Sequence, residues 1–190
     1  MIVKDNIVIY DSRYDLTVDG TFSTNFKDCT TRLDNAVKYA DISVPKPFKG
    51  NWYIYDPVEN SFELTEIGLA GYKDYLTEKL KDQKIQIEYN GIGIGDKIVK
   101  TDLISQQYIN GMYNTSLLNP NLSVLFKYAN KQWDSIDNVQ IEGIARAVSS
   151  HVEACFLREF QLFNEINDVS NYTECLNTEQ HIYQNWPENI

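Results

Sequence analysis

Hydrophobic and polar residues alternate with a period of two in several stretches of the chain, a pattern typical of strands that bury one face. In residues 51–65, aromatic and aliphatic residues alternate with polar ones on both sides of a polar segment at 56–60, which predicts a hairpin. Residues 7–10 form an apolar run that predicts a short strand. The turn pair Asp19-Gly20 follows an apolar stretch and predicts a second hairpin.

The middle of the chain shows the same alternation. Residues 85–89 alternate strictly between apolar and polar, and Asn90-Gly91, a pair typical of tight hairpin turns, follows them. We therefore predict a strand at 85–89 that returns through residues 92–100. A further hairpin is predicted at 124–133, where two apolar runs flank a polar turn.

Apolar residues recur at steps of three and four in four other segments, which predicts amphipathic helices. The last and longest of them contains no Pro and would extend on the order of 40 Å. Its predicted N-cap is Asp137 or Asn138, and that of the first helix is Thr30 or Thr31. The four predicted helices span residues 30–40, 66–82, 102–113 and 138–166.

The apolar stripe of the longest predicted helix has two interpretations. In the first, the stripe packs on the hairpins as part of the core. In the second, it pairs with other copies of the chain, because the apolar positions within 141–155 follow heptad-like steps. The three aromatic residues Phe156, Phe160 and Phe163 suit broad packing instead. We expect a core-facing stripe with a part left exposed, since a helix of this length outruns the core of a small domain.

These elements predict an α+β fold of short β-hairpins and a few helices, with one long amphipathic helix at about 138–166. The polar run at 81–84 indicates a division of the chain. We predict a β-rich attachment module at 1–82, an α+β domain at 83–168 and a polar C-terminal tail at 169–190.

Composition narrows the class of protein. The 190 residues carry a net charge of −10, which argues against the clustered cations that nucleic-acid binding needs. No apolar run approaches the roughly 20 residues that cross a bilayer, and the first residues lack the pattern of a signal peptide. Three widely spaced Cys indicate a reducing compartment rather than a disulfide framework. We therefore expect no nucleic acid and no membrane among the partners, and synthesis in a cytoplasm.

Four residues of the second half are possible zinc ligands: His151, Cys155, Cys175 and His181. Their spacing lacks the short pair of ligands that makes such a prediction specific. His151 flanks the apolar stripe, and no third residue orients a Cys155 nucleophile. A packing role for the His and the thiol is therefore the preferred interpretation.

The remaining polar patterns also favour structural roles. The glycine-rich run 91–95 lacks the spacing of a dinucleotide fingerprint and predicts a hairpin turn with a bulge. Asp11, Asp15 and Asp19 recur at steps of four, which is not the spacing of a calcium loop. We predict no catalytic residue, no metal site and no cofactor, and hence no enzyme.

Residues 85–166 resemble a family of unknown function found at the C-terminal ends of bacteriophage tail fibre and tail fibre assembly proteins. The resemblance is most specific in the long helix, where alanine, valine, His-Val, Cys-Phe and Arg-Glu positions follow one another. The matching residues are Lys100-Thr101-Asp102, Ser105, Ile109-Asn110-Gly111, Phe126-Lys127, Trp133, Ala145, Val148, His151, Val152, Cys155, Phe156 and Glu159.

The resemblance implies a structural component of a phage tail, in the baseplate, an adaptor or a fibre. Its implied partners are other tail or fibre proteins and further copies of the same chain, and its implied location is the tail of the virion. The family has no assigned catalytic residues, which agrees with a packing role for His151 and Cys155. One alternative is a tail fibre assembly chaperone that does not remain in the virion, and a more remote one is a zinc or thiol enzyme.

Overall fold

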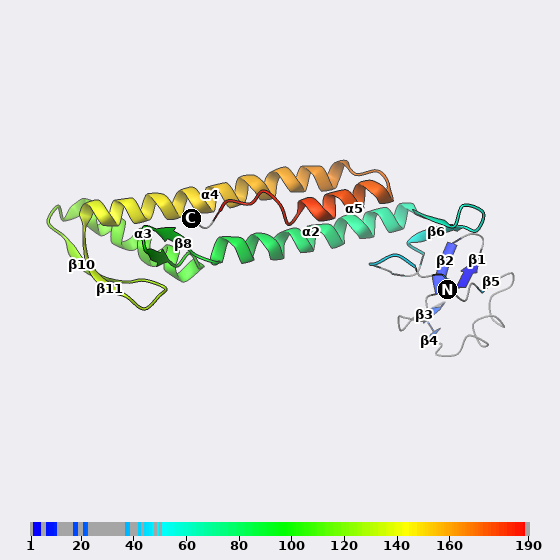
Figure 1. Cartoon of the computed structure of the whole chain (residues 1–190), viewed down its shortest axis with the longest axis horizontal. Helices are drawn as coiled ribbons and strands as arrows, with labels where there is room; N and C mark the ends of the chain where they lie inside the picture. The colour runs from blue at the N-terminus through cyan, green and yellow to red at the C-terminus, as the bar shows by residue number, and fades with distance from the viewer. Residues whose placement is uncertain are drawn as a thin grey trace. The chain divides into compact units, whose positions relative to one another are not determined.

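The computed structural model describes residues 2–4, 7–10, 17–18, 21–22, 37–38, 42, 44–47, 49 and 51–188. The predicted α+β class is confirmed, because short antiparallel strands accompany the helices and a long helix, α4 (Asn138–Asp168), follows them (Figure 1). The chain forms two compact units. The first comprises Met1–Thr77 and Ile166–Glu179, and the second comprises Glu78–Glu165 and Gln180–Ile190.

Among the described residues of the first unit, short strands form two antiparallel sheets. One sheet has the order β5-β1-β2-β6-β7, and β3 pairs with β4 in the other. The predicted strand at 7–10 and the two predicted hairpins are confirmed. The bounds are β1 (Ile2–Lys4), β2 (Ile7–Tyr10), β3 (Thr17–Val18), β4 (Thr21–Phe22), β5 (Val37–Lys38), β6 (Tyr53–Asp56) and β7 (Ser61–Leu64).

The predicted helix at 30–40 lies outside the described residues except at 37–38. There the prediction is wrong, because Val37 pairs with Val3 across the sheet. β-branched residues favour such a pleated position over a helix.

Aromatic residues form the core of the first unit. Trp52, Tyr53 and Tyr55 are buried next to the start of α2 (Glu66–Tyr89), where Thr65 Oγ1 accepts a hydrogen bond from Gly68 N at 2.9 Å. This bond is a helix N-cap and explains where α2 begins.

The polar C-terminal stretch contains a further helix, α5 (Tyr172–His181). The ring of Tyr172 lies edge-on to that of Tyr53, with 5.6 Å between centroids. Glu179 accepts hydrogen bonds from the hydroxyls of Tyr72 and Tyr75 at 3.0 and 2.9 Å. Residues 172–179 therefore contribute to the packing of the first unit.

The second unit builds its core from α3 (Leu103–Leu118), two hairpins and the first half of α4. One hairpin pairs β8 (Ile92–Ile94) with β9 (Lys97–Val99), and the other pairs β10 (Ser123–Lys127) with β11 (Trp133–Asp137). The β10–β11 hairpin is at its predicted position. The buried core residues are Ile92, Val99, Ile109, Met112, Phe126, Tyr128, Ile136, Ile141, Ile144, Ala145 and Val148.

The predicted strand at 85–89 is wrong, because α2 continues through the polar run 81–84 to Tyr89. In the helix, Ile85 and Tyr89 are exposed while Glu88 is buried. The expected turn at Asn90-Gly91 is instead the end of α2, and the hairpin turn lies at Gly95-Asp96.

The long helix α4 begins as predicted. Asp137 Oδ1 accepts a hydrogen bond from Gln140 N at 2.9 Å, and Gln140 Oε1 accepts one from Asp137 N at 3.0 Å. These reciprocal bonds form a capping box. In the described part of the chain, no helix is long and apolar enough to span a membrane.

Candidate functional site

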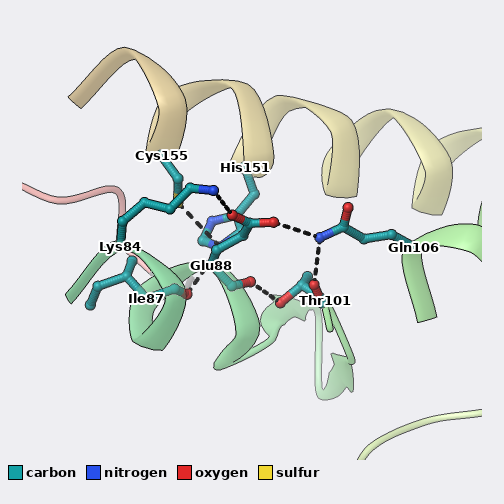
Figure 2. Close-up of polar contacts among 7 residues, drawn as sticks. All are labelled: Lys84, Ile87, Glu88, Thr101, Gln106, His151 and Cys155. Atoms are coloured by element: carbon teal, nitrogen blue, oxygen red, sulfur yellow. Dashed lines mark hydrogen bonds and ion pairs between the residues drawn. The ribbon is translucent and has the colours of Figure 1, made fainter. Parts of the chain in front are cut away.

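A buried polar cluster joins the end of α2 to α3 and α4 in the second unit (Figure 2). Its centre is Glu88, which is 5% exposed. Glu88 Oε1 accepts a hydrogen bond from Gln106 Nε2 at 2.9 Å, and Oε2 lies 2.5 Å from Lys84 Nζ. The Lys84 ammonium also lies 3.8 Å from the ring centre of Phe156. The buried carboxylate therefore has a cation and a neutral donor, as a charge inside a protein requires.

Thr101 connects this cluster to the backbone where α2 ends. Its hydroxyl donates to the carbonyl oxygen of Glu88 at 2.5 Å and accepts from Gly91 N at 2.9 Å. Gln106 Nε2 also donates to the Thr101 carbonyl at 2.7 Å. These bonds use backbone groups that a helix end would otherwise leave unpaired, and they fix where the chain leaves α2.

His151 and Cys155 lie together on α4, beside this cluster, as their spacing predicts. Cys155 Sγ lies 3.8 Å from His151 Nε2, which is 3.3 Å from the carbonyl oxygen of Ile87. Burial, with a smaller contribution from the Glu88 carboxylate, raises the pKa of the Cys155 thiol from 9.0 to about 11. A nucleophilic Cys needs a lowered pKa. The geometry therefore favours a neutral, packed thiol.

The structure does not gather the four possible zinc ligands into one site. Cys175 is buried in the first unit, where burial raises its pKa to about 11. His181 belongs to the second unit, where its Nδ1 contacts the carboxylate of Glu165. Among the described residues, no three His, Cys, Asp or Glu side chains come together in a way that could hold a metal ion.

Two further sequence patterns were considered as sites, the glycine-rich run 91–95 and the three regularly spaced Asp residues. Gly91 and Gly95 have φ angles of 88° and 65°, which an L residue rarely adopts, so the glycine-rich run serves the helix end and the hairpin turn. Asp11, Asp15 and Asp19 lie outside the described residues.

The C-terminal half of α4 carries a row of exposed apolar side chains. Phe156, Leu157, Phe160 and Phe163 are 53, 58, 62 and 44% exposed. The broad packing expected for the three Phe residues is therefore not found within the described part of the chain. The stripe within 141–155 is instead largely buried, so the interpretation as core is confirmed for that part.

A hollow of about 480 Å³ lies between α3 and β10 in the second unit. Its wall combines apolar and aromatic side chains with three lysines and no carboxylate. The lining residues are Lys100, Ile104, Ser105, Tyr108, Ile109, Leu125, Phe126, Lys127, Tyr128, Ala129, Lys131 and Trp133. We call this hollow the α3–β10 groove.

Sequence reasoning missed both the buried ion pair and the groove. Lys84 and Glu88 are spaced at i,i+4, a helical signal that the strand prediction obscured. Ile104 and Tyr108 have the same spacing on α3 and are exposed. No sequence pattern indicates that these two residues lie close to β10, because that proximity depends on tertiary packing.

A family model described as a domain of unknown function (DUF4376) matches residues 72–180. No curated protein and no solved structure gives a match.

Proposed function

The chain belongs to the family described as a domain of unknown function (DUF4376), and we propose that it is a structural component of a bacteriophage tail. In this role it is a baseplate, adaptor or fibre protein that acts through protein–protein assembly and resides in the virion. The resemblance of residues 85–166 to phage tail-associated sequences supports the assignment of the chain to the tail.

The observation that carries the assembly role is the exposed row on α4: Phe156, Leu157, Phe160 and Phe163. Contiguous apolar patches on a folded chain mark interaction surfaces, and aromatic residues are enriched in the centres of interfaces. Full burial of an exposed side chain of this size contributes about 1.5–3 kcal/mol, and covering the roughly half that is still exposed here contributes about half as much. Covering this row with another tail protein or a further copy of the chain stabilises the assembly without any chemical step.

The state of the thiols supports a role without catalysis. The pKa values of Cys155 and Cys175 are both raised to about 11, so neither is ionised near neutral pH. Nucleophilic and metal-ligating cysteines act as thiolates. The polar cluster around Glu88 supports the same role, because its members bond to one another and to the backbone.

Mass spectrometry of purified virions from the strain that carries the gene tests the proposal. We expect peptides of this chain in mature particles, at a level comparable with known tail proteins. Immunogold labelling in electron micrographs should then place it on the tail. Its absence from mature particles would contradict the proposal.

A deletion of the gene separates the tail component from an assembly chaperone. A tail component is present in wild-type particles, and its loss removes or truncates the part that contains it. A chaperone is absent from wild-type particles, yet its loss leaves the fibres misassembled. If the deletion leaves infectious particles with complete tails, both roles are excluded.

A further inference from the structure

Within the described residues, β10 pairs with β11 alone in a two-stranded sheet, so its other edge is free, and Leu125 and Lys127 of β10 line the α3–β10 groove. Tyr128 N donates to Gln132 O at 2.9 Å, across the hairpin. Hydrogen-bonding directions alternate along an antiparallel strand. The N–H and C=O groups of Leu125 and Lys127, three and one residues before Tyr128, therefore point away from β11.

The same edge already holds a neighbouring strand at one end. Ala129 N donates to the carbonyl oxygen of Ile98 in β9 at 2.8 Å. Within the described residues, no backbone group pairs with Leu125 or Lys127 on this side. The edge is thus open next to the groove, and an unpaired edge is a template for an added strand.

The groove offers apolar contacts beside this edge. Ile104 and Tyr108 on α3 are 78 and 55% exposed, and Leu125 and Trp133 on the hairpin are 63 and 54% exposed. Large side chains that remain this exposed beside an open edge provide contacts for alternate residues of a peptide, since successive side chains of a strand point to opposite faces.

The charge of the groove is opposite to that of the whole chain. Lys100, Lys127 and Lys131 line it, and no Asp or Glu does, although the chain carries a net charge of −10. None of these lysines forms an ion pair within the described residues, and Lys127 Nζ lies 5.2 Å over the Trp133 ring. A local cluster of cations attracts an anionic partner.

We propose that the α3–β10 groove binds an extended, acidic peptide segment of a partner protein, which adds as a strand to the free edge of β10. The segment spans the five residues of β10, about 17 Å at the rise of a strand. Acidic side chains of the peptide face the lysines, and apolar or aromatic ones contact Ile104 and Tyr108. The proposal is independent of the tail assignment, because it depends only on this groove.

A selection from an mRNA-displayed library of random 12-residue peptides, with the full chain as bait, tests the proposal. We expect the selected peptides to alternate Asp or Glu with apolar residues. Synthetic, fluorescein-labelled versions then give affinities by fluorescence anisotropy. No enrichment, or enrichment without acidic residues, overturns the proposal.

Two variants test the charge and the strand addition separately. The double variant Lys127→Glu, Lys131→Glu should weaken binding at least about tenfold. The control is the double variant Lys79→Glu, Lys81→Glu, which reverses two charges outside the groove and should change the affinity little. Leu125→Pro removes the outward N–H at an edge position that tolerates Pro, and should also weaken binding about tenfold. Leu125→Ala keeps the N–H and serves as its matched control.

A peptide methylated on alternate backbone nitrogens distinguishes an added strand from other occupants. It should lose binding in only one of the two methylation registers, because only one edge of the peptide faces β10. Equal binding in both registers, or a helical bound peptide by circular dichroism, overturns the extended mode. Self-association of the chain that Lys127→Glu abolishes identifies a second copy as the occupant and also overturns it.

Discussion

Two lysine–glutamate pairs on α2 differ mainly in their exposure, and this difference sets their contribution to stability. The side chains of Lys84 and Glu88 are 12 and 7% exposed, whereas those of Lys81 and Glu78 are 61 and 73% exposed. Lys84→Met leaves the buried carboxylate without its cation. We expect it to lower the free energy of unfolding by about 3 kcal/mol, against less than about 1 kcal/mol for Lys81→Met.

Urea denaturation followed by circular dichroism measures both effects. The double variant Lys84→Met, Glu88→Met should recover part of the loss, because it removes the unpaired charge and keeps the volume apolar. Equal effects of Lys84→Met and Lys81→Met would contradict a buried pair.

The buried thiols make stability depend on pH in the alkaline range. Folding raises the pKa of Cys155 from 9.0 to about 11. Below pH 9 both the folded and the unfolded thiol are protonated. Between pH 9 and 11 the unfolded chain loses this proton first, so the free energy of unfolding falls as the pH rises. Denaturation at several pH values should show a smaller alkaline decline in Cys155→Ala than in the wild type, and identical declines would contradict the shifted pKa.

At the scale of the element, the start of α2 tolerates no side chain at Gly68. A Cβ built there would lie 2.0 Å from the carbonyl oxygen of Trp52, a distance that forces backbone movement. We expect Gly68→Ala to destabilise the protein by more than about 1 kcal/mol, although Ala is the better helix former.

A second glycine provides the matched control. A Cβ at Gly111, within α3, meets nothing within 4 Å. Gly111→Ala should therefore stabilise by about 0.5–1 kcal/mol, through helix propensity alone. Thermal denaturation of the two variants measures the opposite signs, and a shift of the same sign would contradict the close packing of α2 on Trp52.

Elements whose partners are close in sequence were predictable. The hairpins at 51–65 and 124–133 are present because alternation and a short turn suffice to specify them. The first turn of α4 was predictable for the same reason, since Asp137 and Gln140 cap it locally.

Elements that depend on distant partners were not predictable. α3 continues to Leu118 through residues with weak helix propensity, and Asn138 stabilises its end by donating to the carbonyls of Ser116 and Asn119 at 3.2 and 2.8 Å. Residues 85–89 are helical although they alternate like a strand. In the helix Glu88 is buried and bonds to Gln106 and Thr101, which lie on elements further along the chain.

In the candidate site, too, contacts between residues close in sequence were predictable and contacts between distant ones were not. The proximity of His151 and Cys155 followed from their i,i+4 spacing. The contacts of Glu88 with Gln106 and Thr101 did not, since these residues lie on separate elements that only the folded core brings together.

At the scale of the whole molecule, the apolar row on α4 and the α3–β10 groove should respond to salt in opposite directions. Copies that associate through Phe156, Phe160 and Phe163 each carry a net charge of −10 and repel one another. Salt screens this repulsion, with a Debye length of about 8 Å at physiological ionic strength. Self-association should therefore strengthen with salt, whereas an acidic peptide on the lysines of the groove should bind more weakly.

Sedimentation velocity at about 0.05 and 0.5 M salt measures the first effect. Phe160→Asp places a charge in the centre of the row and should shift the protein to the monomer at both salt concentrations. Leu118→Asp adds the same charge at a side chain that is 82% exposed at the end of α3, and should leave association unchanged. If the wild type remains monomeric at high salt, the row on α4 does not bind a second copy, and its partner is a different chain. If both variants weaken association equally, net charge rather than the aromatic row controls it.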